Sequence, residues 1–334
     1  MKTYLQARWL KAAVLLLGCC LMQAGVRAQS PQTQASHAHI PISLTSDTLK
    51  SAGEIPYTAG LSSTGAATYN IPICVSPGRG AAVPRLAIVY NSQGGNGPLG
   101  YGWGLSGLSA ITRVPKNHYY DGTAAPVQLD ATDAFTLDGI RLLPAGGNEF
   151  MPERGNLRVI GTRNVTGYSR FTVNRPDGST AVYETDTSEL VYPIVRLTDA
   201  LGNYMDFTYE WADGQCYVTR IAYGAHASAS GHPAEVRFAY TSRPDVAFTF
   251  EGGQEVRHSR LLTRIECLDG DSVAHVYTLD YAQPEGVSLL QSVGCDGLNP
   301  LRFWYGEDNN QQKKFNYETA HLESFFELPT DNLV

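Results

Sequence analysis

From about residue 57 onward, apolar and polar residues alternate along much of the chain, and helical periodicity is rare. The segment 205–211 (MDFTYEW) places its apolar residues on one face of a strand and Asp, Thr and Glu on the other. Residues 217–223 alternate again, and Asp213-Gly214 lies between the two segments. Because both turn residues tolerate positive φ, this pattern predicts a β-hairpin.

Further Asp-Gly pairs recur at unequal intervals, at Asp121-Gly122, Asp138-Gly139, Asp177-Gly178, Asp269-Gly270 and Asp296-Gly297. Unequal spacing is typical of a meander of hairpins and not of a solenoid or propeller. The 33 Gly and 19 Tyr among 334 residues also favour turn-rich β structure. We therefore predict an all-β fold of hairpin-rich antiparallel sheets, as a sandwich or a partial shell, with few or no helices after the N-terminal segment.

The first 28 residues have the pattern of a signal peptide. A basic region (Lys2, Arg8, Lys11) precedes the apolar stretch 12–22, and Val26-Arg27-Ala28 offers small residues for cleavage before Gln29. A second interpretation is a lipoprotein signal, Leu16-Leu17-Gly18-Cys19, in which Cys19 carries a lipid anchor. A third is a buried helix or signal anchor. The first two interpretations predict an exported protein, secreted or held at the cell surface.

The remaining chain divides by composition into three parts. Residues 29–56 are rich in Gln, Ser, Thr, Ala and Pro and are expected to form a flexible linker, in which His37 and His39 lack the surroundings of a metal site. Residues 57–305 form the predicted all-β region, with a possible internal break at 224–233. Residues 306–334 are either a polar C-terminal tail with a short amphipathic helix or the truncated continuation of a larger protein.

Net charge narrows the classes of partner, and the cysteine spacing bears on disulfides and zinc sites. The net charge of −7 and pI of about 5.6 argue against binding to nucleic acid or to an anionic membrane surface. Four cysteines remain after the leader, and their three possible pairings stay open. The four are Cys74, Cys216, Cys267 and Cys295. Their spacing does not match a zinc site, and single cysteines on strands usually act as small buried apolar residues. We therefore predict no disulfide framework.

The most informative segment runs from Tyr69 to Arg113. It contains an apolar strand, a Pro-Gly-Arg-Gly turn, a second apolar strand at 86–90, and a glycine-rich stretch around Trp103. Glycine permits positive φ and proline fixes φ, so this composition specifies a compact set of turns between strands. The residues that we single out as a structural motif are Pro77, Gly78, Arg79, Gly80, Asn96, Gly97, Pro98, Gly100, Gly102, Trp103 and Gly107.

These positions resemble the N-terminal region of the Salmonella virulence plasmid B protein (SpvB) family. That region is similar to part of the B component of insecticidal toxin complexes and to the front of large Rhs/YD-repeat proteins. The first matching block contains YNIPI, PGRG, YNS and GNGPLGYGWGLSGLSAITR, and weaker blocks follow at 133–142 and 261–305. Residues 207–223 look like a degenerate YD repeat, and 198–203 (TDALGN) resemble the turn that precedes such repeats.

The resemblance implies a non-catalytic, protein-interacting module of a virulence-associated toxin assembly. Its expected partner is a YD-repeat or toxin component, or a second copy bound through the sheet edge near Leu301–Tyr305. In YD-repeat proteins such hairpins form a shell around a polypeptide cargo, but this chain has too few units to close one. The ADP-ribosyltransferase at the C-terminus of SpvB does not correspond to any residues here, so no enzymatic activity and no cofactor are predicted.

The competing function is a secreted carbohydrate-binding or glycan-hydrolysing β protein. Asp130, Asp133 and Asp138 leave room for a carboxylate pair, although aspartates near turns are usually structural. The sequence G-x-G-x-x-G at 102–107 lacks the following helix that a dinucleotide site requires. An open cleft with Trp and paired carboxylates would favour the glycan protein, whereas a packed Trp103 and scattered carboxylates would favour the scaffold.

Two motif residues are expected to have individual roles. Arg79 lies between two glycines, and the favoured interpretation is that it fixes the turn by binding nearby carbonyl oxygens; the alternative is that it faces a partner. Trp103 is the single bulky residue among closely spaced glycines, so we expect it to be a buried anchor and not a ligand platform.

Overall fold

The computed structural model describes residues 53–305 except 166, 186–189, 229–230 and 284–285. The proposed signal peptide, nearly all of the linker with His37 and His39, and the segment 306–334 lie outside the described residues. Strands dominate the described part, which contains one short helix, α2 (His118–Asp121). The all-β prediction is confirmed.

A small antiparallel sheet is built from the family-like segment. Its strand order is β1-β2-β3-β6, and a separate two-stranded ribbon, β4–β5, lies in the connection between β3 and β6. The strands are β1 (Thr58–Leu61), β2 (Ala67–Pro72), β3 (Ala87–Asn91), β4 (Asn96–Gly97), β5 (Gly100–Tyr101) and β6 (Trp103–Ser106). The glycine-rich stretch thus provides a ribbon and a strand joined by tight turns.

The remaining strands form one large antiparallel sheet, part of which closes on itself. Eight consecutive strands run in the order β13-β12-β11-β10-β9-β8-β7-β14, and β13 also pairs with β14, which completes a closed barrel. They are β7 (Ala110–Val114), β8 (Ala134–Leu137), β9 (Ile140–Gly146), β10 (Glu149–Pro152), β11 (Arg158–Arg163), β12 (Tyr168–Asn174), β13 (Thr180–Glu184) and β14 (Val191–Thr198).

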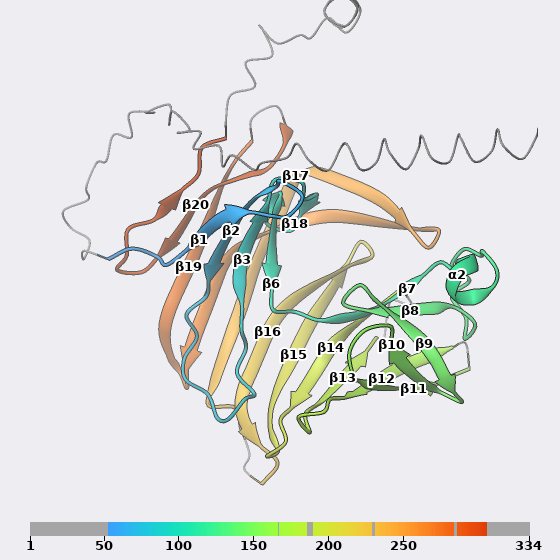
Figure 1. Ribbon diagram of the computed structural model, residues 1–334. Coiled ribbons are helices and arrows are strands. Elements are labelled where there is room, and N and C mark those ends of the chain that lie inside the picture. The colour runs from blue at the N-terminus through green and yellow to red at the C-terminus, as the bar shows by residue number, and fades with distance from the viewer. Residues whose placement is uncertain (1–52, 166, 186–189, 229–230, 284–285, 306–334) are drawn as a thin grey trace, which may run out of the picture. The chain divides into compact units, whose positions relative to one another are not determined.

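Strand β14 connects the barrel to the open part of the sheet. Its first residues, Val191 to Pro193, pair with β7, and its last residues, Arg196 to Thr198, pair with β15. The open part continues in sequence order from β15 to β21 (Figure 1). Its strands are β15 (Asn203–Ala212), β16 (Gln215–His226), β17 (Ala234–Glu251), β18 (Gln254–Asp269), β19 (Ser272–Ala282), β20 (Leu289–Cys295) and β21 (Leu301–Arg302).

The Asp-Gly pairs mark turns, but not all of them mark hairpins. Asp138-Gly139 joins β8 to β9 and Asp213-Gly214 joins β15 to β16, with positive φ at both residues of each pair. These two hairpins are confirmed. Three further pairs, Asp177-Gly178, Asp269-Gly270 and Asp296-Gly297, lie between the antiparallel partners β12–β13, β18–β19 and β20–β21. Asp121-Gly122 instead ends helix α2, where Gly122 adopts the left-handed conformation of a helix C-cap. Asn117 caps the other end of this helix, a signal that alternation alone did not reveal.

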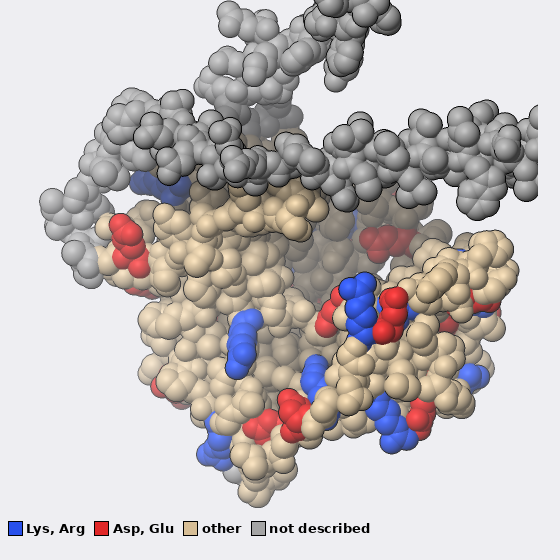
Figure 2. Space-filling view, in the orientation of Figure 1, with Lys and Arg blue, Asp and Glu red and all other residues tan. Residues whose placement is uncertain are grey.

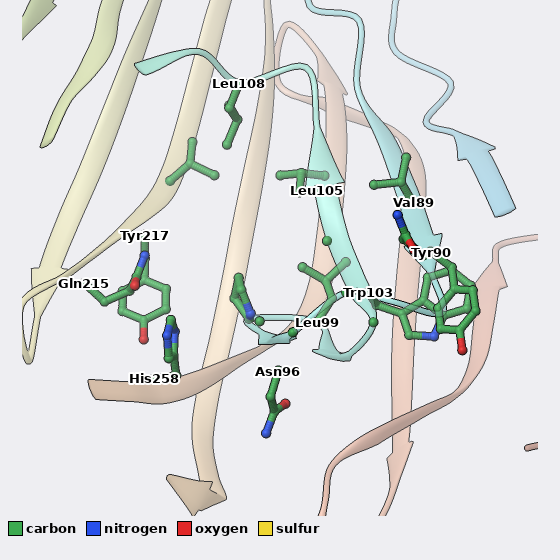
Figure 3. Close-up of a pocket in the computed structure, with 18 of the residues that line it drawn as sticks. Val89, Tyr90, Asn96, Leu99, Trp103, Leu105, Leu108, Gln215, Tyr217 and His258 are labelled. Atoms are coloured by element: carbon green, nitrogen blue, oxygen red, sulfur yellow. The ribbon is translucent and has the colours of Figure 1, made fainter. Parts of the chain in front are cut away.

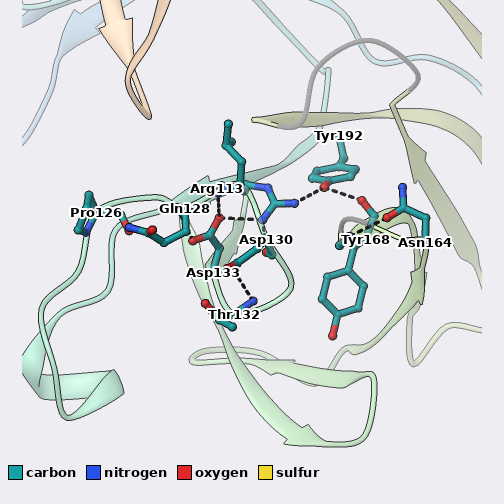
Figure 4. Close-up of polar contacts among 11 residues, drawn as sticks. Arg113, Pro126, Gln128, Asp130, Thr132, Asp133, Asn164, Tyr168 and Tyr192 are labelled. Carbon is teal, nitrogen blue, oxygen red and sulfur yellow. Dashed lines mark hydrogen bonds and ion pairs between the residues drawn. The ribbon is translucent and has the colours of Figure 1, made fainter.

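The barrel is filled by side chains. Its aromatic core, with all rings at least partly packed edge to face, consists of Phe135, Phe150, Tyr168, Phe171 and Tyr192. Arg113 enters this core and is paired with Asp133 at 2.8 Å, with side chains only 1% and 2% exposed (Figure 4). Arg113 also donates to the hydroxyl of Tyr192 at 3.0 Å, so its charge is compensated in the apolar interior.

Tyrosine hydroxyl groups tie neighbouring strands of the open sheet together. Four of them donate to a backbone carbonyl of the strand that precedes them in the sheet, at 2.6–2.9 Å: Tyr209 to Ile194, Tyr240 to Val218, Tyr281 to Leu262 and Tyr305 to Leu290. Each hydroxyl satisfies a carbonyl oxygen of the neighbouring strand. The four bonds recur once in each successive hairpin, and we call this series the tyrosine ladder and each bond a rung.

The segment 224–233, considered as a break, connects two paired strands. Residues 224–226 belong to β16, and Tyr223 lies directly opposite Ala234 at the start of β17. No boundary between compact units falls there. Contacts with the β region also begin slightly before residue 57, since Ile55 is buried and Glu54 bridges to Asn299.

Charged side chains of both signs are scattered over the face shown in Figure 2 and do not gather into a patch of one sign. Many are cross-strand ion pairs, such as Arg196 with Asp206 and Arg170 with Glu184. In each of these exposed pairs the two charges compensate each other, and a single pair contributes little to the free energy of unfolding.

Candidate functional site: the cleft beneath the glycine-rich loop

A cleft of about 860 Å³ separates the small sheet from the open part of the large sheet (Figure 3). One wall consists of β2, β3, β6 and the glycine-rich loop 94–108, and the opposite wall includes residues 215–218, Tyr240 and His258. Five of the predicted motif residues line it, namely Asn96, Gly97, Pro98, Gly102 and Trp103. The motif therefore frames one wall of this cleft.

Trp103 anchors the small sheet, and its predicted burial is confirmed. The side chain is 3% exposed and its ring lies 5.0 Å from that of Tyr90 and 4.6 Å from that of Phe303. Its Nε1–H donates to the hydroxyl of Tyr305 at 2.7 Å, the last rung of the tyrosine ladder. One residue thus connects the glycine-rich segment to the end of the open sheet.

Asn96 holds the glycine-rich loop to a buried ion pair on β17. Its Nδ2 donates to Asp245 Oδ2 at 3.1 Å, and its Oδ1 accepts a bond from Arg243 Nη2. Arg243 also donates to the Gly97 carbonyl at 3.0 Å and is paired with Asp245 at 3.0 Å. Burial alone would raise the pKa of Asp245, but bonds from Arg243, Ser288 and Asn96 outweigh it and hold that pKa well below its usual value.

The rest of the loop is fixed through its backbone. Leu262 N–H donates to the Pro98 carbonyl at 2.8 Å, and Tyr101 N–H donates to the Ser288 carbonyl at 3.0 Å. Gly100 has a φ of +87°, and a Cβ atom there would lie 2.6 Å from the Ser288 oxygen. Only glycine allows the loop to approach the large sheet this closely.

The Pro-Gly-Arg-Gly turn docks onto a second motif. Ala81 N–H donates to Asp199 Oδ2 at 3.1 Å, and the left-handed Gly80 packs directly against Asp199 and Asn203. These acceptors belong to the TDALGN turn, so the structure joins two motifs that the sequence separates. Desolvation would raise the pKa of Asp199, but bonds from Asn203, Ala81 and Leu201 lower it overall.

The other motif residues of these turns have varied surroundings. Pro77 and Gly78 are exposed, Gly78 lies against Tyr223, and Gly107 adopts positive φ beside the backbone of Arg85. Arg79 is exposed and makes no polar contact with another described residue. Among the described residues, Asp199 supplies the side-chain contact that holds the turn, and the role of Arg79 stays a prediction.

The cleft contains one thiol and one imidazole, but neither is prepared for nucleophilic chemistry. Burial raises the pKa of the Cys216 thiol to about 12, the reverse of what a reactive thiolate requires. Burial, together with the nearby charge of Arg243, lowers the pKa of His258 and favours the neutral ring. Its Nδ1 is buried without a hydrogen-bond partner among the described residues.

The carboxylates considered for acid–base chemistry are engaged separately. Asp133 is paired with Arg113 and accepts the N–H groups of Gln128 and Leu129, both at 2.8 Å (Figure 4). Asp130 accepts from Thr132, and Asp138 accepts from Ser109 and Ala110. Within residues 53–305, apart from the gaps, no three His, Cys, Asp or Glu side chains form a metal-binding group.

These observations define a class of protein: a hairpin-built antiparallel β module in which a small glycine-rich sheet is clamped over an open sheet. Sequence comparison agrees with this class, because residues 61–149 match the family model "SpvB: Salmonella virulence plasmid 65kDa B protein". The matched residues extend from the end of β1 to the start of β10. The resemblance that the motifs predict is confirmed.

Solved structures share this fold at low sequence identity. The crystal structure of TcdB2-TccC3 has a TM-score of 0.63 at 17% identity, covering 77% of this chain and 17% of that chain. The N-terminal domain of effector protein SpvB from Salmonella typhimurium strain LT2 has a TM-score of 0.56 at 16% identity, covering 70% and 98%. The Photorhabdus luminescens Tc holotoxin pore has a TM-score of 0.61 at 18% identity, covering 77% and 16%.

The chain thus corresponds to about a sixth of the toxin-complex chain and to nearly all of the SpvB domain. A sequence search of curated proteins gives no match. Among the described helices, none has the length and apolar content needed to span a bilayer.

Proposed function

We propose that this protein is a non-catalytic structural module of an exported, toxin-type assembly and that it binds polypeptide partners. The observation that carries this proposal is the clamp: the family motif residues are used to hold one sheet over another, and none of them presents a reactive group. Trp103 is packed, and Asp130, Asp133 and Asp138 are held by separate local contacts. These features disfavour the glycan-hydrolysing alternative.

The last strand of the large sheet offers a place for a partner. Strand β21 pairs with β20 through Leu301 and Arg302, and β21 ends the strand order among the described strands. Phe303 N–H donates back to Gln291 at 2.9 Å, so the alternating main-chain groups of Arg302 point toward the open edge. An open edge can accept a further strand through main-chain hydrogen bonds.

A YD-repeat polypeptide fits this edge. Its hairpins would continue the strand order that already runs from β15 to β21, and its tyrosines would extend the ladder that ends at Tyr305. The TcdB2-TccC3 match supports this partner class, since in that protein the similar region belongs to a much longer chain. Export through the signal at residues 1–28 is part of the same proposal.

A binding experiment with matched variants tests the proposal. The full-length mature chain is immobilised and exposed to a YD-repeat toxin component. Arg302→Pro removes the outward N–H without touching the bonds to β20 and should abolish capture, whereas Arg302→Ala should retain it. Equal capture by both variants, or turnover of NAD or a glycan that one carboxylate substitution abolishes, would contradict the proposal.

A further inference from the structure

The hairpin of β17 and β18 extends beyond its sheet as a two-stranded arm, residues 246–258. Strand β16 pairs with β17 only at Ala234 to Arg237, and β19 pairs with β18 only from Arg264 onward. Strands β17 and β18 nevertheless stay paired up to Glu251 and Gln254. Figure 1 shows the arm (orange) reaching away from the rest of the open sheet.

The arm begins at a bulge and is supported along its length. The register between β17 and β18 shifts between Ser242 and Ala247, where Arg243 and Asp245 form the clamp with Asn96. Farther out, Arg257 N–H donates to the Asp213 carbonyl at 2.8 Å. At the tip, Gly252 lies against Leu190 and Val127. These contacts fix the arm against the body of the protein.

One face of the arm is apolar and exposed. Val246, Phe248 and Phe250 alternate along β17 and are 46%, 62% and 68% exposed. The two phenyl rings contact each other edge to face at 6.2 Å. On the paired strand, Arg257 lies opposite Phe248 and Glu255 lies opposite Phe250, and these two charges form an ion pair. Exposed aromatic residues grouped in this way usually mark an interaction surface.

The outer edge of β17 is open as well. Because the Arg257 N–H bonds to Asp213, Arg257 and Phe248 form a non-hydrogen-bonded pair of the ladder. The N–H and C=O of Phe248 therefore point away from β18, as do those of Phe250, which lies two residues farther along the same register. No described strand pairs with this edge.

We propose that this edge pairs with the same edge of a second copy of the chain, antiparallel and with a two-fold axis at Thr249. Phe248 then lies opposite Phe250 of the second copy, twice by symmetry. In each row of side chains across the four strands, Phe248 and Phe250 of the second copy form the central aromatic pair. Arg257 lies at one end of the row and Glu255 of the second copy at the other, so opposite charges flank the aromatic pair. A register centred on Phe248 would instead bring Glu251 toward Asp245 of the second copy, two like charges.

The self-complementary charges and rings select a second copy over an unrelated partner. An isologous interface requires every residue to meet its counterpart under one rotation, and this strand satisfies the requirement for both its aromatic and its charged positions. The interaction is independent of the edge at β21, because it uses neither β20 nor β21.

Disulfide trapping tests the register directly. In a Cys74→Ser background of the full-length mature chain, Thr249→Cys places two thiols across a non-hydrogen-bonded pair, where Cα atoms are about 4.5 Å apart and a disulfide can form. With oxidised glutathione as the electron acceptor, the two thiols give one intermolecular disulfide and two reduced glutathione molecules. Thr162→Cys, exposed on β11 between paired strands, is the matched control.

We expect the Thr249→Cys chain to cross-link into a dimer and the Thr162→Cys chain to stay at the background level. Adding Phe248→Ser and Phe250→Ser should slow cross-linking by about tenfold or more, whereas adding Arg302→Pro should leave it unchanged. Both phenylalanines are exposed, so circular dichroism of the variants should match the parent. Cross-linking at Thr249 no faster than at Thr162, or unaffected by the serine substitutions, would overturn the proposal.

Discussion

Trp103 shows how far a single residue can be predicted from sequence. A bulky side chain among glycines indicates a buried anchor, because the glycines let neighbouring backbones approach it. The sequence did not reveal its partner, Tyr305, since the two residues lie 202 positions apart and meet only through the complete sheet.

Replacing Trp103 tests this anchor. We expect Trp103→Ala to lower the free energy of unfolding by about 3–5 kcal/mol, the usual cost of deleting a large aromatic side chain from a core. Trp304 is 67% exposed and is its neighbouring control, for which Trp304→Ala should change the free energy by less than about 0.5 kcal/mol. Urea denaturation of both variants measures the difference, and equal midpoints for Trp103→Ala and the parent would contradict the anchor.

Asp245 is expected to make the clamp sensitive to acid. Its pKa is lower in the folded chain than in the unfolded chain, so its contribution to stability is present above the unfolded value of about 4 and is lost as pH falls below it. Asp245→Asn should cost about 3–5 kcal/mol near neutral pH, because it leaves Arg243 buried without its counter-charge.

The same variant should also show a weaker loss of stability than the parent between about pH 4 and pH 2. Denaturant midpoints at several pH values measure both effects. Parallel pH profiles for parent and variant would show that Asp245 is not held in the ionised form by the clamp.

Arg79 illustrates what sequence reasoning could not decide. The motif correctly marked a turn, but which side chain holds it depends on a contact with Asp199, well over a hundred residues away. Local spacing carries no information about such a contact. The same motif singled out Asn96, but the local pattern could not predict that Asn96 bonds to Arg243 and Asp245.

At the scale of elements, alternation predicted the strands, and five of the six Asp-Gly pairs marked hairpin connections, because both signals are local. The closure of the barrel between β13 and β14 and the bulge that begins the arm have no local signature. The tyrosine ladder was missed for a related reason. Its rungs recur once per hairpin in space, but the hairpins differ in length, so the tyrosines recur at unequal intervals in sequence.

The ribbon β4–β5 depends on close approach to the large sheet. Gly100→Ala should therefore destabilise the chain more than Gly122→Ala, although both glycines have positive φ. Gly122 has open space around it, so its substitution should cost only the strain of an alanine held at positive φ, about 1–2 kcal/mol. At Gly100 the Ser288 carbonyl must also move. Thermal or urea denaturation compares the two variants, and equal losses would show that the ribbon does not need the close contact.

At the scale of the whole molecule, the two sheets act as one unit because motif residues clamp them at two places. The glycine-rich loop binds Arg243 and Asp245, and the Pro-Gly-Arg-Gly turn binds Asp199. A clamped module in which β21 has no further described strand beside it suits the proposed role, in which further hairpins are added at β21. The central claim is that this edge receives a polypeptide strand.

Amide hydrogen exchange at the β21 edge is the most direct test of that claim. The full chain is compared alone and with a YD-repeat toxin component. Exchange is followed at Arg302, whose N–H points outward, and at Phe303, whose N–H is already bonded to Gln291. The account predicts that binding slows exchange strongly at Arg302 and little at Phe303. Binding of that component with no change in the exchange of Arg302 would contradict the account.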